Sequence, residues 1–170
     1  MRPPDNPDYC KEGSTHPSAK LFPLARAGRH LAMYDPSTKK STAFEPPPIP
    51  IDLSGYETTA MFATSKDGTK VPFFLTAKKG LARDGNNPTM IYGYGGFSVT
   101  TLPTYRQDVP AWLEMGGVWV TASMRGGAEY GEKWHEAGML EKKQNVFDDF
   151  IAVAEHLIRE KYTSPPKLGV

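Results

Sequence analysis

The chain has 170 residues, 39% of them hydrophobic and 23% charged, and its 20 basic and 19 acidic side chains leave a net charge of +1. This near-neutral charge excludes the bulk electrostatic attraction that draws proteins to nucleic acid or to anionic membranes. No apolar run approaches the ~20 residues that cross a bilayer, no secretion signal is visible, and a single cysteine cannot form an internal disulfide. We therefore expect a soluble, cytoplasmic protein.

Residues 1–50 predict an irregular lead-in that ends in one small hairpin. Several prolines before residue 27 disfavour regular structure there. Two short apolar runs, Leu31–Tyr34 and Ser41–Phe44, flank a polar connection and predict a hairpin. The proline-rich Glu45–Pro50 predicts a stiff connector. This connector places the expected domain boundary between residues 1–50 and 51–170.

Residues 51–115 predict a second hairpin, a buried strand and a helix. The strand-like runs Thr58–Thr64 and Val71–Thr76 are joined by a segment that holds the turn signal Asp67-Gly68. After a polar loop, Thr89–Tyr92 is short, apolar and followed by glycines, which predicts a buried strand leading into a tight loop. Pro110–Met115 has a proline suited to the first turn of a helix.

The last third predicts a strand, a long helix and the start of another strand. Val118–Ala122 is rich in β-branched residues, and Asn145 is the expected N-cap of a helix that Ser164–Pro166 ends. The predicted core face of this helix comprises Phe147, Phe150, Ile151, Ala154, Leu157 and Ile158. Leu168–Val170 begins an apolar segment. Alternating strands and helices predict an α/β fold with a parallel sheet, cut off in mid-sheet.

The glycine-rich segment Tyr92–Phe97 is the most informative motif. Glycines just after a strand let the backbone turn sharply and approach a ligand closely. A dinucleotide loop is disfavoured, because Ser98 stands where its third glycine belongs and no helix start follows. Two interpretations remain open. One is an oxyanion loop for acyl transfer, as in hydrolases, and the other is a purely structural turn with packed aromatics.

A second glycine-rich loop, Arg125–Gly131, follows the strand Val118–Ala122. Pairing of Arg125 with Glu129 would brace this loop, whereas a free Arg125 would bind a carboxylate. We expect the bracing role. Asp148 and Asp149 are adjacent, so they do not face one another on a helix, and we expect both to complement the helix dipole as first-turn acids.

The remaining polar residues show no complete catalytic or metal motif. The four histidines and one cysteine lack the spacing of a metal site. No G-x-S-x-G occurs, and neither Ser98 nor Ser123 is followed by a convincing helix. The absence of these short motifs does not rule out a Ser-His-Asp triad, because the members of such a triad can lie far apart in the sequence. We expect no metal and no cofactor.

Several motifs together resemble one family. Residues 56–170 are similar to the start of the peptidase domain of the prolyl oligopeptidases, a family of serine peptidases. The resembling stretches are Tyr56–Thr58, Ser65–Pro72, Tyr92–Phe97, Arg125–Gly131, Trp134–His135 and Lys143–Phe150. Residues 28–54 look loosely like the last strands of the family's β-propeller, and no resemblance is evident before Gly28.

The resemblance implies an α/β-hydrolase domain, incomplete in 51–170, that cleaves short peptides after proline by acyl transfer from a serine. Tyr94 looks like the tyrosine that supplies an oxyanion-hole donor, and Phe97 looks like an aromatic wall of the proline pocket. Ala128 replaces a usual glycine. The family's serine elbow would follow shortly after Val170, with the aspartate and histidine later, so we expect the chain alone to be inactive. The alternative is an inactive relative that binds peptides or proteins, with self-association through an exposed sheet edge.

Overall fold

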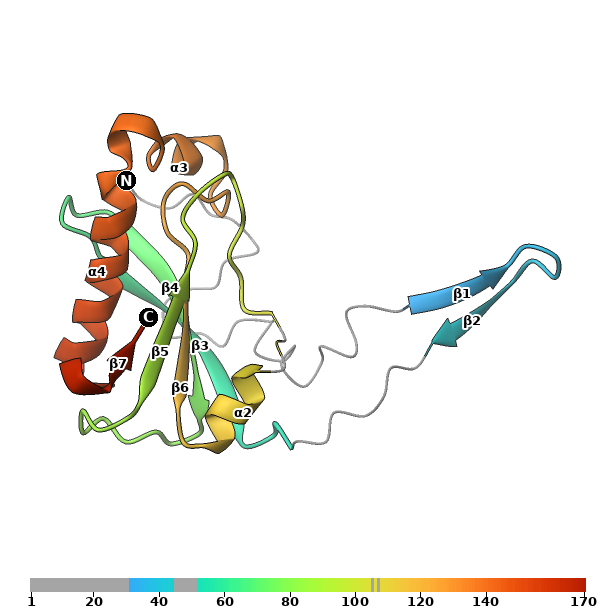
Figure 1. The fold of residues 1–170 in the computed structure, drawn as a ribbon, viewed down its shortest axis with the longest axis horizontal. Helices are drawn as coiled ribbons and strands as arrows, with labels where there is room; N and C mark the ends of the chain where they lie inside the picture. The colour runs from blue at the N-terminus through green and yellow to red at the C-terminus, as the bar shows by residue number, and fades with distance from the viewer. Residues whose placement is uncertain (1–30, 45–51, 105, 107) are drawn as a thin grey trace.

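A computed structural model describes residues 31–44, 52–104, 106 and 108–170, arranged as a hairpin and a larger sheet with helices (Figure 1). In the hairpin, β1 (Leu31–Asp35) pairs antiparallel with β2 (Lys40–Phe44), as predicted. The Asp35 carboxylate accepts hydrogen bonds from Ser37 and Thr38 in the turn. These bonds lower the pKa of Asp35 to about 2. The predicted lead-in and the predicted connector Glu45–Pro50 lie outside the described residues.

The larger sheet has five strands in the order β3-β4-β6-β5-β7. They are β3 (Tyr56–Thr64), β4 (Lys70–Lys78), β5 (Thr89–Gly93), β6 (Val118–Ala122) and β7 (Leu168–Gly169). Strands β5, β6 and β7 are parallel, but β3 and β4 form an antiparallel hairpin and β4 also runs antiparallel to β6. The expected parallel sheet is thus a mixed one. The hairpin joins the parallel part through β4, which lies beside β6, so the chain crosses the position of β6 between β4 and β5.

Helices cover the two faces of this sheet (Figure 1). Helix α4 (Gln144–Arg159) packs on the face that carries Val118, Val120 and Ala122 of β6. Helix α2 (Asp108–Glu114) packs on the opposite face, where its Val109 and Leu113 contact Trp119. Because alternate residues of a strand point to opposite faces, one short strand serves both cores. Two small helical segments, α3 (Glu132–Glu136) and a 3-10 turn at Leu140–Lys142, precede α4 and were not predicted.

Helix α4 corrects two expectations about its start and its buried face. Asn145 is not the N-cap, because the helix begins after Lys143, and the Asn145 side chain instead donates to the Ala137 carbonyl at 2.9 Å. The buried residues are Val146, Asp149, Ala152, Val153 and Leu157, whereas Phe147 and Ile151 are 55% and 51% exposed. The predicted core face is confirmed for Leu157, which is buried, and for Phe150 and Ala154, which pack against the core, and it is wrong for Phe147 and Ile151.

No helix among the described residues is long and apolar enough to cross a membrane. The main core lies between α4 and the sheet, and it is built from large side chains on β4, β5 and β6. Phe73, Ile91 and Val120 are all at most 2% exposed there. This rigid layer supports the loops that leave the carboxyl ends of β5 and β6.

Candidate functional site

The loop after β5 presents two aromatic side chains to solvent. Tyr94 is 49% exposed and Phe97 is 85% exposed, and their ring centroids lie 6.4 Å apart with an interplanar angle of 34°. Phe97 and Ser98 both have positive φ, 51° and 55°. A bulky residue in this region costs about 1 kcal/mol or more, so the surrounding contacts must enforce the conformation. A large exposed ring on a strained backbone indicates a binding role rather than packing.

The glycines of this loop are required by close packing beneath it. A Cβ on Gly93 would lie 2.6 Å from the Met124 Cε atom. Gly95 has φ +58°, and a Cβ there would collide with the Val146 side chain and approach the Arg125 carbonyl oxygen to 3.2 Å. The loop backbone therefore lies directly on the start of α4 and on the loop that follows β6.

Polar contacts fix the path of the loop after β5. The Lys143 ammonium donates to the Gly95 carbonyl at 2.8 Å. The Ser98 N–H donates to the Gly126 carbonyl at 3.1 Å. His135 Nδ1 lies 2.7 Å from this carbonyl oxygen and 3.2 Å from the Ser98 nitrogen, so the imidazole ring contacts both groups of this hydrogen bond. Both ends of the Gly95–Ser98 segment are thus held by residues that follow β6.

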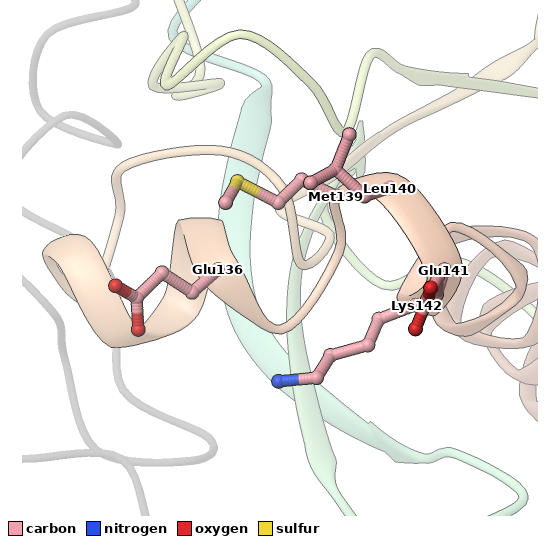
Figure 2. A pocket seen from close by; sticks show the side chains of 5 residues that line it. All are labelled: Glu136, Met139, Leu140, Glu141 and Lys142. Carbon is pink, nitrogen blue, oxygen red and sulfur yellow. The ribbon is translucent and has the colours of Figure 1, made fainter.

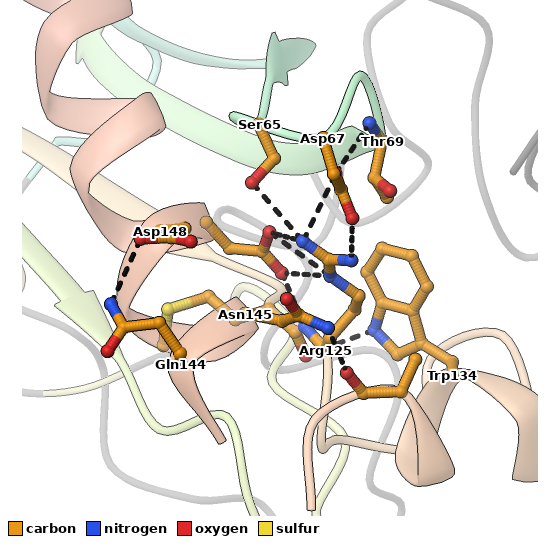
Figure 3. Close-up of polar contacts among 11 residues, drawn as sticks. Ser65, Asp67, Thr69, Arg125, Trp134, Gln144, Asn145 and Asp148 are labelled. Carbon is orange, nitrogen blue, oxygen red and sulfur yellow. Dashed lines mark hydrogen bonds and ion pairs between the residues drawn. The ribbon is translucent and has the colours of Figure 1, made fainter. Parts of the chain in front are cut away.

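The loop Arg125–Gly131 is anchored by a buried charge network (Figure 3). The Arg125 side chain is 5% exposed, and its Nε and Nη2 donate to the fully buried Asp149 carboxylate at 2.9 and 2.6 Å. Arg125 also pairs with Asp67 in the β3–β4 turn and donates to Ser65 at 3.2 Å. Burial opposes ionisation of Asp67, yet hydrogen bonds from Arg125 and Thr69 lower its pKa to about 2.

This network corrects two predictions. Arg125 braces the fold as expected, but its partners are Asp149 and Asp67 rather than Glu129. Neither Asp148 nor Asp149 lies in the first turn of α4, and Asp149 is instead a buried ion-pair partner. The pairing joins the β3–β4 hairpin, the loop after β6 and α4, three segments that are far apart in the sequence.

Glu129 is buried on the same loop and contacts the segment that follows Phe97. It is 3% exposed, and its Oε1 accepts the Thr101 N–H at 2.7 Å. Burial raises the pKa of Glu129 to about 7, although the Thr101 hydrogen bond acts in the opposite direction. The Thr101 carbonyl in turn accepts the hydroxyl of Ser123 at 2.8 Å. Ser123 is fully buried and donates into the structure, so it is not placed as a nucleophile.

A shallow groove of about 810 Å³ lies beside α3, and the described residues that line it are Glu136, Met139, Leu140, Glu141 and Lys142 (Figure 2). Charged side chains of both signs border the exposed Leu140. Within residues 31–44, 52–104, 106 and 108–170, no three His, Cys, Asp or Glu side chains form a group suited to a metal ion.

The structure brings the two predicted site residues together and adds others. Tyr94 and Phe97 lie side by side on one exposed loop. Lys143, His135 and Glu129 support that loop but were not predicted to do so. Glu129 was already singled out within its glycine-rich motif, whereas Lys143 appeared in the sequence analysis as the first residue of the resembling stretch Lys143–Phe150.

Comparisons with known proteins point to one family. The model of the prolyl oligopeptidase family matches residues 103–170. A peptidase of Sinorhizobium fredii, named as uncharacterised, is 41% identical over 98% of this chain and 24% of its own length. The prolyl endopeptidase of Elizabethkingia meningoseptica is 43% identical over 77% of this chain and 19% of its own. The first alignment includes residues before Gly28, where the motifs had indicated no resemblance.

Solved structures agree with the sequence comparisons. A prolyl endopeptidase structure superposes with a TM-score of 0.73 at 48% identity, covering 82% of this chain and 20% of that one. A post-proline cleaving enzyme from Rickettsia typhi gives a TM-score of 0.70 at 40% identity, covering 77% of this chain and 19% of its own. The chain thus spans between about a fifth and a quarter of the length of these relatives.

Proposed function

The chain carries part of a sequence of the prolyl oligopeptidase family, and on this premise we propose that the protein is a serine-type endopeptidase that hydrolyses short peptides on the carboxyl side of proline. Residues 52–170 then form part of an α/β-hydrolase domain. Residues 31–44 belong in this proposal to the end of a β-propeller. A cytoplasmic location stays a prediction from the sequence, which cell fractionation would test.

One observation carries the proposal: an exposed tyrosine and an exposed phenylalanine share a rigidly held glycine loop at the carboxyl end of β5. Ligands of α/β sheets bind beyond the carboxyl ends of the strands. A phenol donates a hydrogen bond to a developing oxyanion, and a flat apolar ring suits the pyrrolidine of proline. We assign the first role to Tyr94 and the second to Phe97.

The chemistry is acyl transfer. A serine hydroxyl loses its proton to the histidine of the triad and attacks the carbonyl carbon of the proline residue, so that a C–O bond to the enzyme forms and the carbonyl oxygen gains negative charge that Tyr94 stabilises. The C–N bond then breaks as the leaving amine takes a proton, and water releases the acyl group. The 170 residues hold no G-x-S-x-G elbow. We take the triad to come from the part of the relatives' length that these residues do not span, so the 170 residues alone are expected to be inactive.

The test uses the full-length product of the gene and a peptide series that differs only in proline or alanine before the cleaved bond. We expect a clear preference for proline. Tyr94→Phe should lower kcat by about 10²- to 10³-fold, the usual loss when one oxyanion donor is removed. Tyr92→Phe is the matched control, because Tyr92 is similarly exposed, at 42%, but stacks on Trp119 within the sheet. An unchanged rate in Tyr94→Phe would remove this residue from the mechanism.

The alternative is a non-catalytic relative that binds peptides or other proteins. It is favoured by the exposed apolar side chains Leu140, Phe147 and Ile151, which are 81%, 55% and 51% exposed on the 3-10 turn and α4. A fluorophosphonate probe that reacts with activated serines separates the two functions. Labelling of the full-length product supports the peptidase, whereas absence of labelling together with retained peptide binding supports the alternative.

A further inference from the structure

The short segment between Phe97 and Thr101 is held at both ends by the loop after β6. At its start, the Ser98 N–H donates to the Gly126 carbonyl at 3.1 Å. At its end, the Thr101 N–H donates to Glu129 Oε1 at 2.7 Å, and the Thr101 carbonyl accepts from Ser123. Thr101 is 7% exposed, whereas the residues before it are exposed. The segment is therefore a short exposed arch between two anchors.

The neighbouring backbone leaves room for the Glu129 carboxylate at one position. A Cβ on Gly127 would lie 2.9 Å from the Glu129 Cδ atom and closer still to a carboxylate oxygen. Real Cβ atoms do not approach other atoms so closely, so the absent side chain at Gly127 makes room for the carboxylate. The backbone of this loop is in turn fixed by the Arg125–Asp149 pair. A buried carboxylate on a rigid loop is a precise anchor for a neighbouring backbone N–H.

We propose that Glu129 is a positioning residue, which sets the place of the Phe97 ring by holding Thr101 and thereby governs affinity for the proline ring of the substrate. This inference rests on the proposed function. Glu129 lies under the arch and acts through Thr101, so it is assigned no contact with the substrate.

The Phe97 ring depends on its backbone for its position. The ring is 85% exposed, and Tyr94 is the aromatic neighbour within the described residues. Side-chain packing alone therefore does little to hold it. Positive φ at Phe97 and Ser98 adds strain that would relax if one anchor were lost. Losing the bond to Glu129 leaves Thr101 with the bond from Ser123, which loosens the far end of the arch. The Phe97 ring then samples positions that no longer match a bound pyrrolidine.

The hydrogen bond from Thr101 needs only a lone pair on Oε1, which suggests a matched set of variants. Glu129→Ala removes the acceptor. Glu129→Asp keeps the charge but is one methylene shorter and cannot reach the N–H. Glu129→Gln keeps the acceptor oxygen without charge. Glu155→Ala is the control, because Glu155 is exposed on α4 and far along the helix from the loop.

We measure kcat and KM of the full-length product for a peptide with proline before the cleaved bond. Glu129→Ala and Glu129→Asp should raise KM by about five- to tenfold, the effect of losing one hydrogen bond, with kcat changed less than about threefold. Glu129→Gln should restore most of the affinity, and Glu155→Ala should match the wild type. A wild-type enzyme without activity overturns the proposed function; an active wild type with unchanged KM in Glu129→Asp overturns only this inference.

Two further readouts separate positioning from general destabilisation. Amide hydrogen exchange, which needs no activity, should accelerate at Thr101 in Glu129→Asp and stay unchanged at Gly95. In a double-mutant cycle, Phe97→Ala combined with Glu129→Asp should have the KM of Phe97→Ala alone, because Glu129 acts through that ring. Additive effects on KM, or unchanged exchange at Thr101, would contradict the proposal.

Discussion

The two glycine-rich loops at the carboxyl ends of β5 and β6 differ sharply in how their side chains are used. The loop after β5 exposes Tyr94 and Phe97. The loop after β6 buries Arg125 and Glu129 at 4% and 3% exposure. Glycine serves a different purpose in each, since Gly95 lets the first loop lie on α4 and Gly127 makes room for a carboxylate in the second.

This difference shows a division of labour between the loops, in which one loop exposes side chains and the other supports it. The exposed loop holds groups suited to chemistry but has few contacts of its own. The buried loop has no exposed reactive group of this kind, yet it supplies the Gly126 carbonyl and the Glu129 carboxylate that hold its neighbour. Damage to the Arg125–Asp149 pair that anchors the buried loop should therefore appear as lost stability, and damage to the exposed side chains Tyr94 and Phe97 as lost function.

The largest effect is expected from the ion pair that anchors the buried loop. Asp149→Asn leaves Arg125 buried without its main counter-charge, so the free energy of unfolding should fall by about 3 to 5 kcal/mol. Urea unfolding of the chain followed by circular dichroism measures this. Asp148→Asn is the control, because the neighbouring Asp148 accepts an exposed hydrogen bond from Gln144, and this variant should change stability by about 0.5 kcal/mol or less. Equal effects of the two variants would contradict the division of labour.

The second effect concerns pH and the buried carboxyl of Glu129. Its pKa is raised from 4.5 to about 7, so the folded state favours the protonated form. The contribution of the raised pKa to the free energy of unfolding is fully present below pH 4.5. It is lost as the pH rises through about 7, and the total loss is about 3 kcal/mol. The difference in unfolding free energy between wild type and Glu129→Gln, followed from pH 4 to 8, should change by that amount. If this difference in unfolding free energy does not change with pH, burial does not raise the pKa of Glu129.

A smaller effect is expected at Lys143, which lies just before α4 and holds the loop after β5. Lys143→Met removes the hydrogen bond to the Gly95 carbonyl while keeping the aliphatic part of the side chain. We expect a loss of about 1 kcal/mol in stability, and faster proteolytic cleavage between Gly93 and Ser98. Lys142→Met, one residue earlier and exposed, is the matched control. If both variants are cleaved at the same rate, Lys143 does not restrain the loop.

The smallest effect on stability is expected in the exposed loop itself. Phe97→Ala removes a ring that is 85% exposed, so the free energy of unfolding should change by about 0.5 kcal/mol or less. Under the proposed function, the same variant raises KM for proline peptides in the full-length product. A large loss of stability would mean that the ring packs against the protein, and the contrast between the loops would then disappear.

The sequence alone predicted the elements that depend on local patterns. The β1–β2 and β3–β4 hairpins, β5, β6 and α4 were all expected, because alternation, turn residues and helical spacing are local signals. The sheet was predicted as parallel, and it is mixed because the antiparallel β3–β4 hairpin joins the parallel strands through β4. That choice depends on contacts between β4 and β6, which no local pattern encodes.

The sequence predicted the exposed residues of the site but not the residues that hold them in place. Tyr94 and Phe97 were selected from a motif that is continuous in the sequence. Asp149 was misassigned, because a buried aspartate on the core face of a helix makes sense only once Arg125 is seen beside it. Glu129 was paired with the wrong partner for the same reason. Residues that act through distant partners leave little signal in a single sequence.

The strand order has a consequence for how the loop after β5 is made during synthesis. Both neighbours of β5 in the sheet, β6 and β7, follow it in the chain. As the polypeptide leaves the ribosome, β3 and β4 can pair with each other before β6 is made, although β4 gains its second neighbour only with β6. Strand β5, by contrast, has no hydrogen-bonded neighbour in the sheet until β6 is made. Lys143 and Glu129, which hold the loop after β5, are translated later still than β6. The aromatic pair is thus synthesised early but assembled late in co-translational folding.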